Sequence, residues 1–170
     1  MPISAPSITV RKANIADAAS IASIYNESVR AGGTTMDDVE KTEADVVQEM
    51  KSFHSREGYL LLLKNEVTIG WAAYRRYSNK AGYRFACETA IYLHREATGQ
   101  GLGHILQTAL IAHCKSISYH HLVAKIYGSN TRSIRFHELY GYELVGMQRE
   151  IGFKEGRWED VALMQCILDA

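Results

Sequence analysis

The stretch Ala90-Ile-Tyr-Leu-His94-Arg-Glu-Ala-Thr98-Gly-Gln-Gly-Leu-Gly103-His104 combines three local signals in one short run. It begins as an apolar strand, continues through three glycines, and leads into apolar residues at helical spacing from Ile105 onward. Glycines let the backbone turn tightly and approach a ligand closely, and the first N–H groups of a helix have no partner within it. A strand, a glycine turn and a helix start in this order predict a cradle for an anion, most naturally a phosphate.

Two familiar phosphate motifs do not fit this cradle. A Walker loop requires Lys and then Ser or Thr after its last glycine, whereas His104 follows here. A dinucleotide-binding turn has the form G-x-G-x-x-G with an acidic residue about twenty positions later. This chain has G-x-G-x-G instead, and Tyr119-His-His-Leu122 stands downstream. The cradle therefore serves another phosphate ligand, or it is only a turn.

Composition limits the class of protein. The 170 residues fit one domain, and 46% of them are apolar. The 19 basic and 19 acidic residues cancel, which argues against a nucleic-acid partner, and no apolar run approaches the ~20 residues that span a bilayer. The start of the sequence shows no secretory signal, and three widely spaced cysteines favour reduced thiols, so we expect a cytoplasmic protein. We predict a flexible N-terminus, residues 1–7, and a single domain, residues 8–170.

Periodicity along the chain predicts eleven elements in the order β-α-α-β-β-β-α-β-α-β-β. Strands are expected at residues 8–12, 59–63, 67–77, 83–93, 122–126, 143–147 and 158–168, and helices from Asn14, from Thr42, from the glycine turn to about Ser118, and over 130–140. Short connections make the three middle strands antiparallel, whereas the strand-helix-strand unit around the glycine turn allows a parallel pair. The fold class is α/β, with a mixed sheet flanked by helices on both faces in three layers.

One carboxylate stands out within the predicted strands. Strict alternation places Glu88 on one face of the strand together with Arg84, Ala86, Ala90 and Tyr92. A carboxylate in the middle of a long central strand is unusual. It is either solvated or paired with Arg84, or it is a partly buried carboxylate whose pKa is raised and which acts as a base.

Other polar residues leave a structural and a functional interpretation open. His137 follows Ser133 by one helical turn and is either structural or functional. Arg75 and Arg76, at a strand end, are either solvated or bind a substrate carboxylate. The remaining histidines lack the spacing of a metal site, so no metal is expected.

These segments in this order resemble the GNAT superfamily of acyl-CoA-dependent N-acyltransferases. The superfamily signature Q/R-x-x-G-x-G/A matches Thr98-Gly-Gln-Gly-Leu-Gly103 at both glycines, and a later N-x-x-S/A element matches Asn130-Thr-Arg-Ser133. The strings Glu88-Thr-Ala-Ile-Tyr-Leu93, 134–142 and 151–161 further resemble the phosphinothricin and methionine sulfoximine/sulfone N-acetyltransferases. The resemblance covers about residues 8–168 and implies a GNAT-like fold with a mostly antiparallel sheet.

The resemblance implies acetyl-CoA as co-substrate and no metal. Backbone groups of Ile91 and Leu93 would pair with the pantetheine arm like an added strand, and the glycine turn would hold the pyrophosphate. Thr98 replaces the usual Gln or Arg, so this cradle is expected to rely on backbone N–H groups. The implied cofactor-binding residues are Ile91, Tyr92, Leu93, Thr98, Gly99, Gln100, Gly101, Leu102, Gly103, His104, Asn130 and Ser133.

The resemblance also implies roles in catalysis and substrate binding. Glu88 would be the general base that deprotonates the substrate ammonium through water, and the free amine would attack the thioester directly. His137, where many members carry Tyr, would help protonate the leaving thiolate or shape that region. The related enzymes often have Trp-Arg where this chain has Tyr77-Ser78, and Arg75-Arg76 come slightly earlier here, so either carboxylate recognition has moved or the substrate differs. The expected substrate-binding residues are Met36, Arg75, Arg76, Tyr77, Ser78, Arg84, Ala86 and Glu88.

The leading hypothesis is therefore transfer of an acetyl group to the amine of a small amino-acid-like substrate. A nearer alternative is the same chemistry on a polyamine or a protein N-terminus, and a more distant one is a non-catalytic acyl-CoA sensor. The related enzymes are homodimers, so we expect a homodimer with a small-molecule amine as its partner and no nucleic acid or membrane partner.

Overall fold

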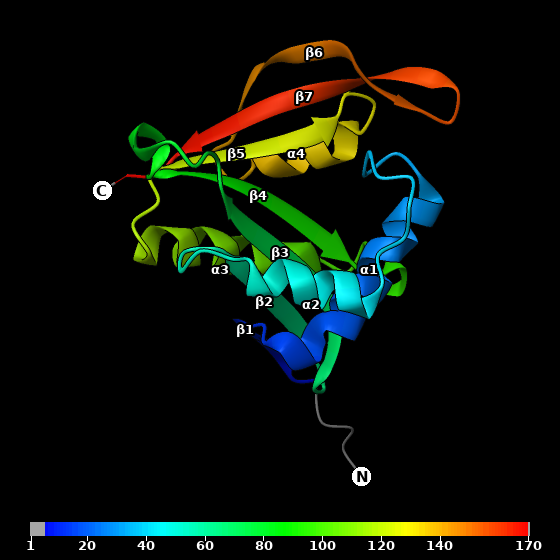
Figure 1. Cartoon of the computed structure of the whole chain (residues 1–170), viewed down its shortest axis with the longest axis vertical. Coiled ribbons are helices and arrows are strands. Elements are labelled where there is room, and N and C mark those ends of the chain that lie inside the picture. Colours follow the sequence, from blue (N-terminus) through cyan, green and yellow to red (C-terminus); the bar gives the residue numbers. More distant parts are fainter. Residues whose placement is uncertain (1–5, 170) are drawn as a thin grey trace.

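A seven-stranded sheet in the order β1-β2-β3-β4-β5-β7-β6 runs through the computed structural model, which describes residues 6–169 (Figure 1). Five of its six strand pairings are antiparallel, and β4 pairs with β5 in parallel. The strands are β1 (Ile8–Lys12), β2 (Gly58–Lys64), β3 (Val67–Arg76), β4 (Ala86–Leu93), β5 (His121–Tyr127), β6 (Glu143–Lys154) and β7 (Arg157–Ile167). The helices are α1 (Ala18–Ala31), α2 (Glu43–Lys51), α3 (Leu102–Ser116) and α4 (Thr131–Glu138), with short 3-10 turns η1 (Ile15–Asp17), η2 (Ala81–Tyr83) and η3 (Arg95–Ala97).

Two apolar cores lie on opposite faces of this sheet. Leu60 and Leu62 of β2 belong to the core that contains Leu106 of α3, whereas Leu61, between them, belongs to the core that contains Ile21 of α1. A strand buried on both faces reads as a continuous apolar run, which explains the sequence of β2. The expected three-layer α/β fold with a mixed, mostly antiparallel sheet is confirmed.

Two predicted strand boundaries are wrong, each for a local reason. The strand expected from Tyr83 begins at Ala86, because residues 81–83 form the 3-10 turn η2. The strand expected at 143–147 continues to Lys154 as β6, whose register with β7 shifts between Leu144 and Gly146 and again between Gln148 and Gly152. These irregularities break the alternation that marks a strand.

The parallel pair β4–β5 creates the space for the site. The two strands are paired only from Ala86–His121 to Glu88–Val123. Beyond that point β4 stays paired with β3 as far as Leu93, and β5 stays paired with β7 as far as Tyr127. The two strands therefore diverge and leave a wedge between them, as Figure 1 shows.

The predicted flexible N-terminus lies mostly outside the described residues, because residues 1–5 are not described. Within the described part, the Ser7 N–H donates to Oδ1 of Asn65, and the Asn65 N–H donates to the Ser7 carbonyl, both at 2.9 Å. None of the helices formed by residues 6–169 is long and apolar enough to cross a membrane.

Candidate active site

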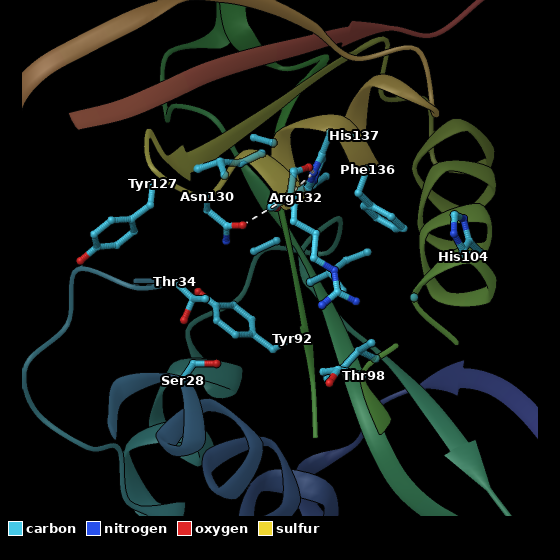
Figure 2. A pocket seen from close by; sticks show the side chains of 18 of the residues that line it. Ser28, Thr34, Tyr92, Thr98, His104, Tyr127, Asn130, Arg132, Phe136 and His137 are labelled. Carbon is cyan, nitrogen blue, oxygen red and sulfur yellow. Dashed lines mark hydrogen bonds between the residues drawn. The ribbon is translucent and has the colours of Figure 1, made fainter. Parts of the chain in front are cut away.

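The wedge between β4 and β5 holds a cavity of about 520 Å³ (Figure 2). Its walls are the diverging ends of both strands, the glycine turn before α3 and the first turns of α4. Ten of the twelve residues predicted to bind the cofactor line it, together with His137: Ile91, Tyr92, Leu93, Thr98, Gly99, Gly101, Gly103, His104, Asn130 and Ser133. The other two turn away, because Nε2 of Gln100 donates to the Glu96 carbonyl and Leu102 packs in the core.

The glycine turn leaves open space above the start of α3. Gly99 and Gly101 both have φ 76°, in the left-handed region that favours glycine. A Cβ atom built at either residue would find no heavy atom within 4 Å. Gly101 is the N-cap of α3 and no side chain caps the helix, so the N–H groups of its first two residues are available to an anion, whereas the His104 N–H donates to the Gly101 carbonyl at 3.1 Å. The hydroxyl of Thr98 is directed away from this role, since it donates to the Arg95 carbonyl at 2.8 Å.

Arg132 is a cationic residue of this cavity that the sequence analysis missed. Its side chain extends from the first turn of α4 across the cavity toward Thr98, as Figure 2 shows. Among the described lining residues, Arg132 and Lys125 are basic and none is acidic. The available signal was the position of Arg132 between Asn130 and Ser133, two residues already assigned to the cofactor. The lining thus fits an anionic ligand, and Arg132 supplies a side-chain cation where Thr98, in the position of the usual Gln or Arg, supplies none.

Asn130 combines a structural and a possible binding role. Its Oδ1 accepts a hydrogen bond from the Ser133 N–H at 3.1 Å and caps α4. No hydrogen bond involves its Nδ2 within the described chain, and the residue lines the cavity. The cap and the ligand contact predicted for this motif are therefore compatible.

His137 is a buried, neutral side chain in the cavity wall. Its Nδ1 lies 2.8 Å from the Ser133 carbonyl, so this nitrogen carries the proton and donates. Burial lowers the pKa of His137 and outweighs the opposing effect of that hydrogen bond. The ring stands perpendicular to the ring of Tyr142, at 5.0 Å between centroids, and the Tyr142 hydroxyl lies 2.9 Å from Oγ1 of Thr89. Packing and hydrogen bonding therefore hold the imidazole in one orientation.

A second cavity of about 420 Å³ adjoins the first. Its outer walls differ from those of the first cavity, because they are formed by residues 34–36 after α1 and by the bulged part of β6 at residues 148–152. The predicted substrate residue Met36 lines it, and Gly152 gives Met36 room, because a Cβ atom at 152 would lie 2.7 Å from the Met36 sulfur. Five residues line both cavities: Thr34, Tyr92, Lys125, Ile126 and Tyr127.

Buried polar contacts fix the wall that Met36 belongs to. Lys154 of β6 is only 5% exposed, and its Nζ donates to the carbonyls of Thr35 and Asp37 at 2.9 and 2.7 Å. The Tyr127 hydroxyl also donates to the Thr35 carbonyl, at 3.1 Å. The Tyr25 hydroxyl contacts both the Thr35 hydroxyl and the Asp37 carboxylate. These hydrogen bonds therefore fix the segment after α1, which forms one wall of the second cavity.

Glu88 lies at the point where β4 and β5 begin to diverge. It lines neither of the two cavities, but its Oε2 accepts a hydrogen bond from Nζ of Lys125 at 2.8 Å, and Lys125 lines both. The Glu88 side chain is 38% exposed. The carboxylate is therefore paired, with Lys125 rather than with Arg84.

The arginines expected to bind a substrate carboxylate have protein partners instead. Arg75 bonds the Glu49 carboxylate at 3.0 Å, and its guanidinium stacks on aromatic rings of the α2 side. Arg76 lies 3.6 Å from the Glu57 carboxylate, and Arg84 donates to the Ala81 carbonyl. Seven of the eight predicted substrate residues line neither cavity: Arg75, Arg76, Tyr77, Ser78, Arg84, Ala86 and Glu88. Across residues 6–169, no three His, Cys, Asp or Glu side chains gather in a group that could hold a metal ion.

Residues 10–163 match the sequence profile of the family described as Acetyltransferase (GNAT) domain. The chain belongs to the GNAT acetyltransferase family. It is an N-acetyltransferase whose acetyl donor is acetyl-CoA, as the motifs around the glycine turn predicted.

Three relatives narrow the comparison. The L-methionine sulfoximine/L-methionine sulfone acetyltransferase of Pseudomonas aeruginosa is 33% identical over 168 residues, covering 96% of each chain. The phosphinothricin N-acetyltransferase of Alcaligenes faecalis is 32% identical, over 95% of this chain and 83% of that protein. The crystal structure of a phosphinothricin acetyltransferase from Sinorhizobium meliloti, in complex with acetyl-CoA, superimposes with a TM-score of 0.89 at 36% identity, over 95% of this chain and 88% of that one.

Proposed function

We propose that this acetyltransferase moves the acetyl group of acetyl-CoA directly to the amine of a small amino-acid-like acceptor of the phosphinothricin or methionine sulfoximine/sulfone type. The observation that carries the proposal is the pair of adjoining cavities with a shared wall at Tyr92, Ile126 and Tyr127. Two substrates held side by side at such a wall react without an acyl-enzyme. The names of the three relatives support the acceptor class.

The larger cavity is proposed to take acetyl-CoA. Beyond Glu88 the edge of β4 that faces β5 has no strand partner among the described residues, so backbone groups of Ile91 and Leu93 are available to an extended amide-bearing arm. The pyrophosphate would lie over Gly99 and Gly101, next to the uncapped start of α3. Arg132 adds a cation on the opposite side of the cavity.

The proposed reaction begins with a proton transfer, because an ammonium has no lone pair with which to attack. Glu88 accepts the proton through water, and the free amine attacks the thioester carbonyl carbon. A backbone N–H near Ile91 stabilises the oxyanion. The C–S bond then breaks, and the departing thiolate takes up the second proton, which the attacking nitrogen loses as it becomes an amide. His137 fits the shaping role better than the proton-donor role, since its one N–H is already engaged by the Ser133 carbonyl.

The test is thiol release from acetyl-CoA over a panel of amino acids and analogues, with kcat/KM read for each. Glu88→Gln is expected to lower kcat mainly at low pH, where the acceptor is fully protonated, and to leave acetyl-CoA affinity intact. Glu138→Gln, an exposed substitution on α4 outside both cavities, is the control. Turnover by Glu88→Gln that matches wild type from pH 6 to 9 would remove Glu88 from the mechanism.

The alternatives make different demands on the second cavity. A polyamine carries several positive charges and needs carboxylates around it, whereas the described lining of this cavity contains Lys125 and no acidic residue. This observation counts against a polyamine. Turnover of peptides rather than amino acids would identify a protein N-terminus as the acceptor. Cofactor binding with no turnover of any amine would identify a sensor.

We also propose that the enzyme is a cytoplasmic homodimer. Strand β6, at the edge of the sheet, exposes apolar side chains that a second copy can cover, and Phe153 and Trp158 stack beside them across the β6–β7 hairpin. The exposed apolar residues of β6 are Leu144, Val145, Met147, Ile151 and Phe153. The three cysteines are free and buried, as a reducing compartment would leave them. Sedimentation equilibrium would report the monomer or dimer mass.

A further inference from the structure

Lys125 lines both cavities and forms an ion pair with Glu88, which lines neither but lies where β4 and β5 begin to diverge. Lys125 lies on β5 two residues beyond Val123, the partner of Glu88, so both side chains project from the same face just where the strands separate. Nζ of Lys125 and Oε2 of Glu88 are 2.8 Å apart, and the side chains are 49% and 38% exposed. An ion pair this exposed contributes little to stability, so a ligand can replace either partner at small cost.

Lys125 is the cation of the site that is placed to receive an acceptor carboxylate in the second cavity, because Arg132 lines only the larger cavity. Lys125 is the one basic side chain among the described residues that line the second cavity. Arg75 and Arg76 are paired with Glu49 and Glu57, and Lys154 is bonded to two backbone carbonyls. Among these cations, Lys125 is therefore the one that can recognise an anionic acceptor in the second cavity.

We infer that the Glu88–Lys125 pair is the receptor for the zwitterionic head of an α-amino acid, which binds by exchanging partners with it. The acceptor carboxylate takes the place of Glu88 on the Lys125 ammonium. The acceptor ammonium takes the place of Lys125 beside the Glu88 carboxylate. Each charge of the acceptor thus meets the opposite charge on the protein, and no ion is left unpaired. This inference rests on the proposed function and names the group that selects its substrate class.

The exchange couples recognition to catalysis. An acceptor without a carboxylate leaves Lys125 bonded to Glu88, so the proposed base keeps its cationic partner. An amino acid withdraws Lys125 and presents its own ammonium to the carboxylate that must take the proton. Lys125 keeps its proton throughout, and only the acceptor proton moves to Glu88. Lys125 is accordingly a specificity-determining residue rather than a proton carrier.

The experiment compares L-methionine sulfone with its α-carboxamide, which keeps the amine and side chain but loses the carboxylate. The enzymes are wild type, Lys125→Met, Lys125→Arg and the control Lys115→Met on the exposed side of α3. Lys125→Met is expected to lower kcat/KM for the acid about tenfold, the lower range for a lost charge-assisted hydrogen bond at a half-exposed site. It should leave kcat/KM for the carboxamide equal or higher, because Glu88 is released. Comparing the acid-to-carboxamide ratio across variants cancels the different basicity of the two amines.

Further outcomes separate the explanations. Lys125→Arg should retain most of the preference for the acid, and Lys115→Met should retain all of it. An equal fall for both acceptors, or a weaker acetyl-CoA Kd in Lys125→Met, would assign Lys125 to the cofactor or to general packing and overturn the inference. Unchanged turnover of the acid by Lys125→Met would overturn the inference while leaving the proposed function intact. Wild-type enzyme that acetylates neither compound but does acetylate other amines would overturn both.

Discussion

Gly101→Ala is expected to separate the backbone role of the glycine turn from its ligand-binding role. Gly101 has φ 76° and ψ 0°, and alanine in the left-handed region costs roughly 1–2 kcal/mol. The added Cβ would meet no heavy atom within 4 Å, so no steric term is added in the ligand-free protein. For a domain of this size, 1 kcal/mol corresponds to about 2–4 °C in Tm. The expected loss is therefore about 2–8 °C.

Ligand binding should suffer more than stability. The new methyl group would occupy the open space through which the pyrophosphate is proposed to approach the start of α3. Loss of one charge-assisted hydrogen bond costs roughly 1.5–3 kcal/mol, which raises the acetyl-CoA Kd about 10- to 150-fold. Gly156 provides a matched control, because it has φ 77°, its Cβ position is also open, and it lies in the β6–β7 turn outside both cavities.

The assay is thermal unfolding of the ligand-free proteins together with calorimetric titration of acetyl-CoA. Gly101→Ala and Gly156→Ala should lose similar amounts of Tm, and only Gly101→Ala should bind more weakly. Equal Kd values for the two variants would show that the glycine turn does not hold the pyrophosphate, and the assignment of the larger cavity would then fail.

Two further predictions concern Arg132 and two histidines, His137 and His113. Arg132→Met should raise the acetyl-CoA Kd about fivefold and flatten its salt dependence, because an exposed charge pair contributes up to about 1 kcal/mol. The control is Arg135→Met, which lies one turn along the same helix and outside both cavities. Equal Kd values for the two variants would exclude Arg132 from the phosphate site. Burial lowers the pKa of His137 and of His113, so the unfolded chain takes up protons near pH 6.5 before the folded one does. The free energy of unfolding should consequently fall as the pH drops below about 6.5, and His137→Asn should reduce this loss; urea titrations at pH 7.5 and 5.5 would contradict the assignment if both proteins lost stability equally.

The lining of the larger cavity, which is proposed to take the cofactor, could be predicted from sequence because it is built from short contiguous motifs. The glycine turn and the Asn130 motif each fix a local backbone geometry, and the parallel β4–β5 pair brings the two together. Arg132 escaped notice because its direction depends on the packing of α4 rather than on spacing. The predicted assignment of side chains to the two faces of β4 is also confirmed, since Cys87 and Tyr92 pack in cores on opposite faces of the sheet.

The second cavity, which is proposed to take the acceptor, could not be predicted in this way because segments far apart in the sequence form it. Its wall at Thr35 is held by Lys154, 119 residues away, and Gln148 belongs to a bulge that hides the strand periodicity. Arg75 shows the converse case. Its partner Glu49 comes from α2, and nothing in the local sequence around either residue indicates that they meet.

The divergence of β4 and β5 explains why the sheet can hold a ligand at its centre without losing its integrity. Each strand keeps a complete partner on its other side, so opening the wedge gives up only one row of ladder hydrogen bonds. Buried backbone groups that lose a partner must find another, and an extended amide-bearing arm can replace a strand at the β4 edge. The same separation begins at Glu88, so the proposed base lies at the apex of the wedge, beside the cavities proposed for the donor and the acceptor. Tyr92, four residues further along the same face of β4, lines both cavities, so the two cavities meet on the side of the strand from which Glu88 projects.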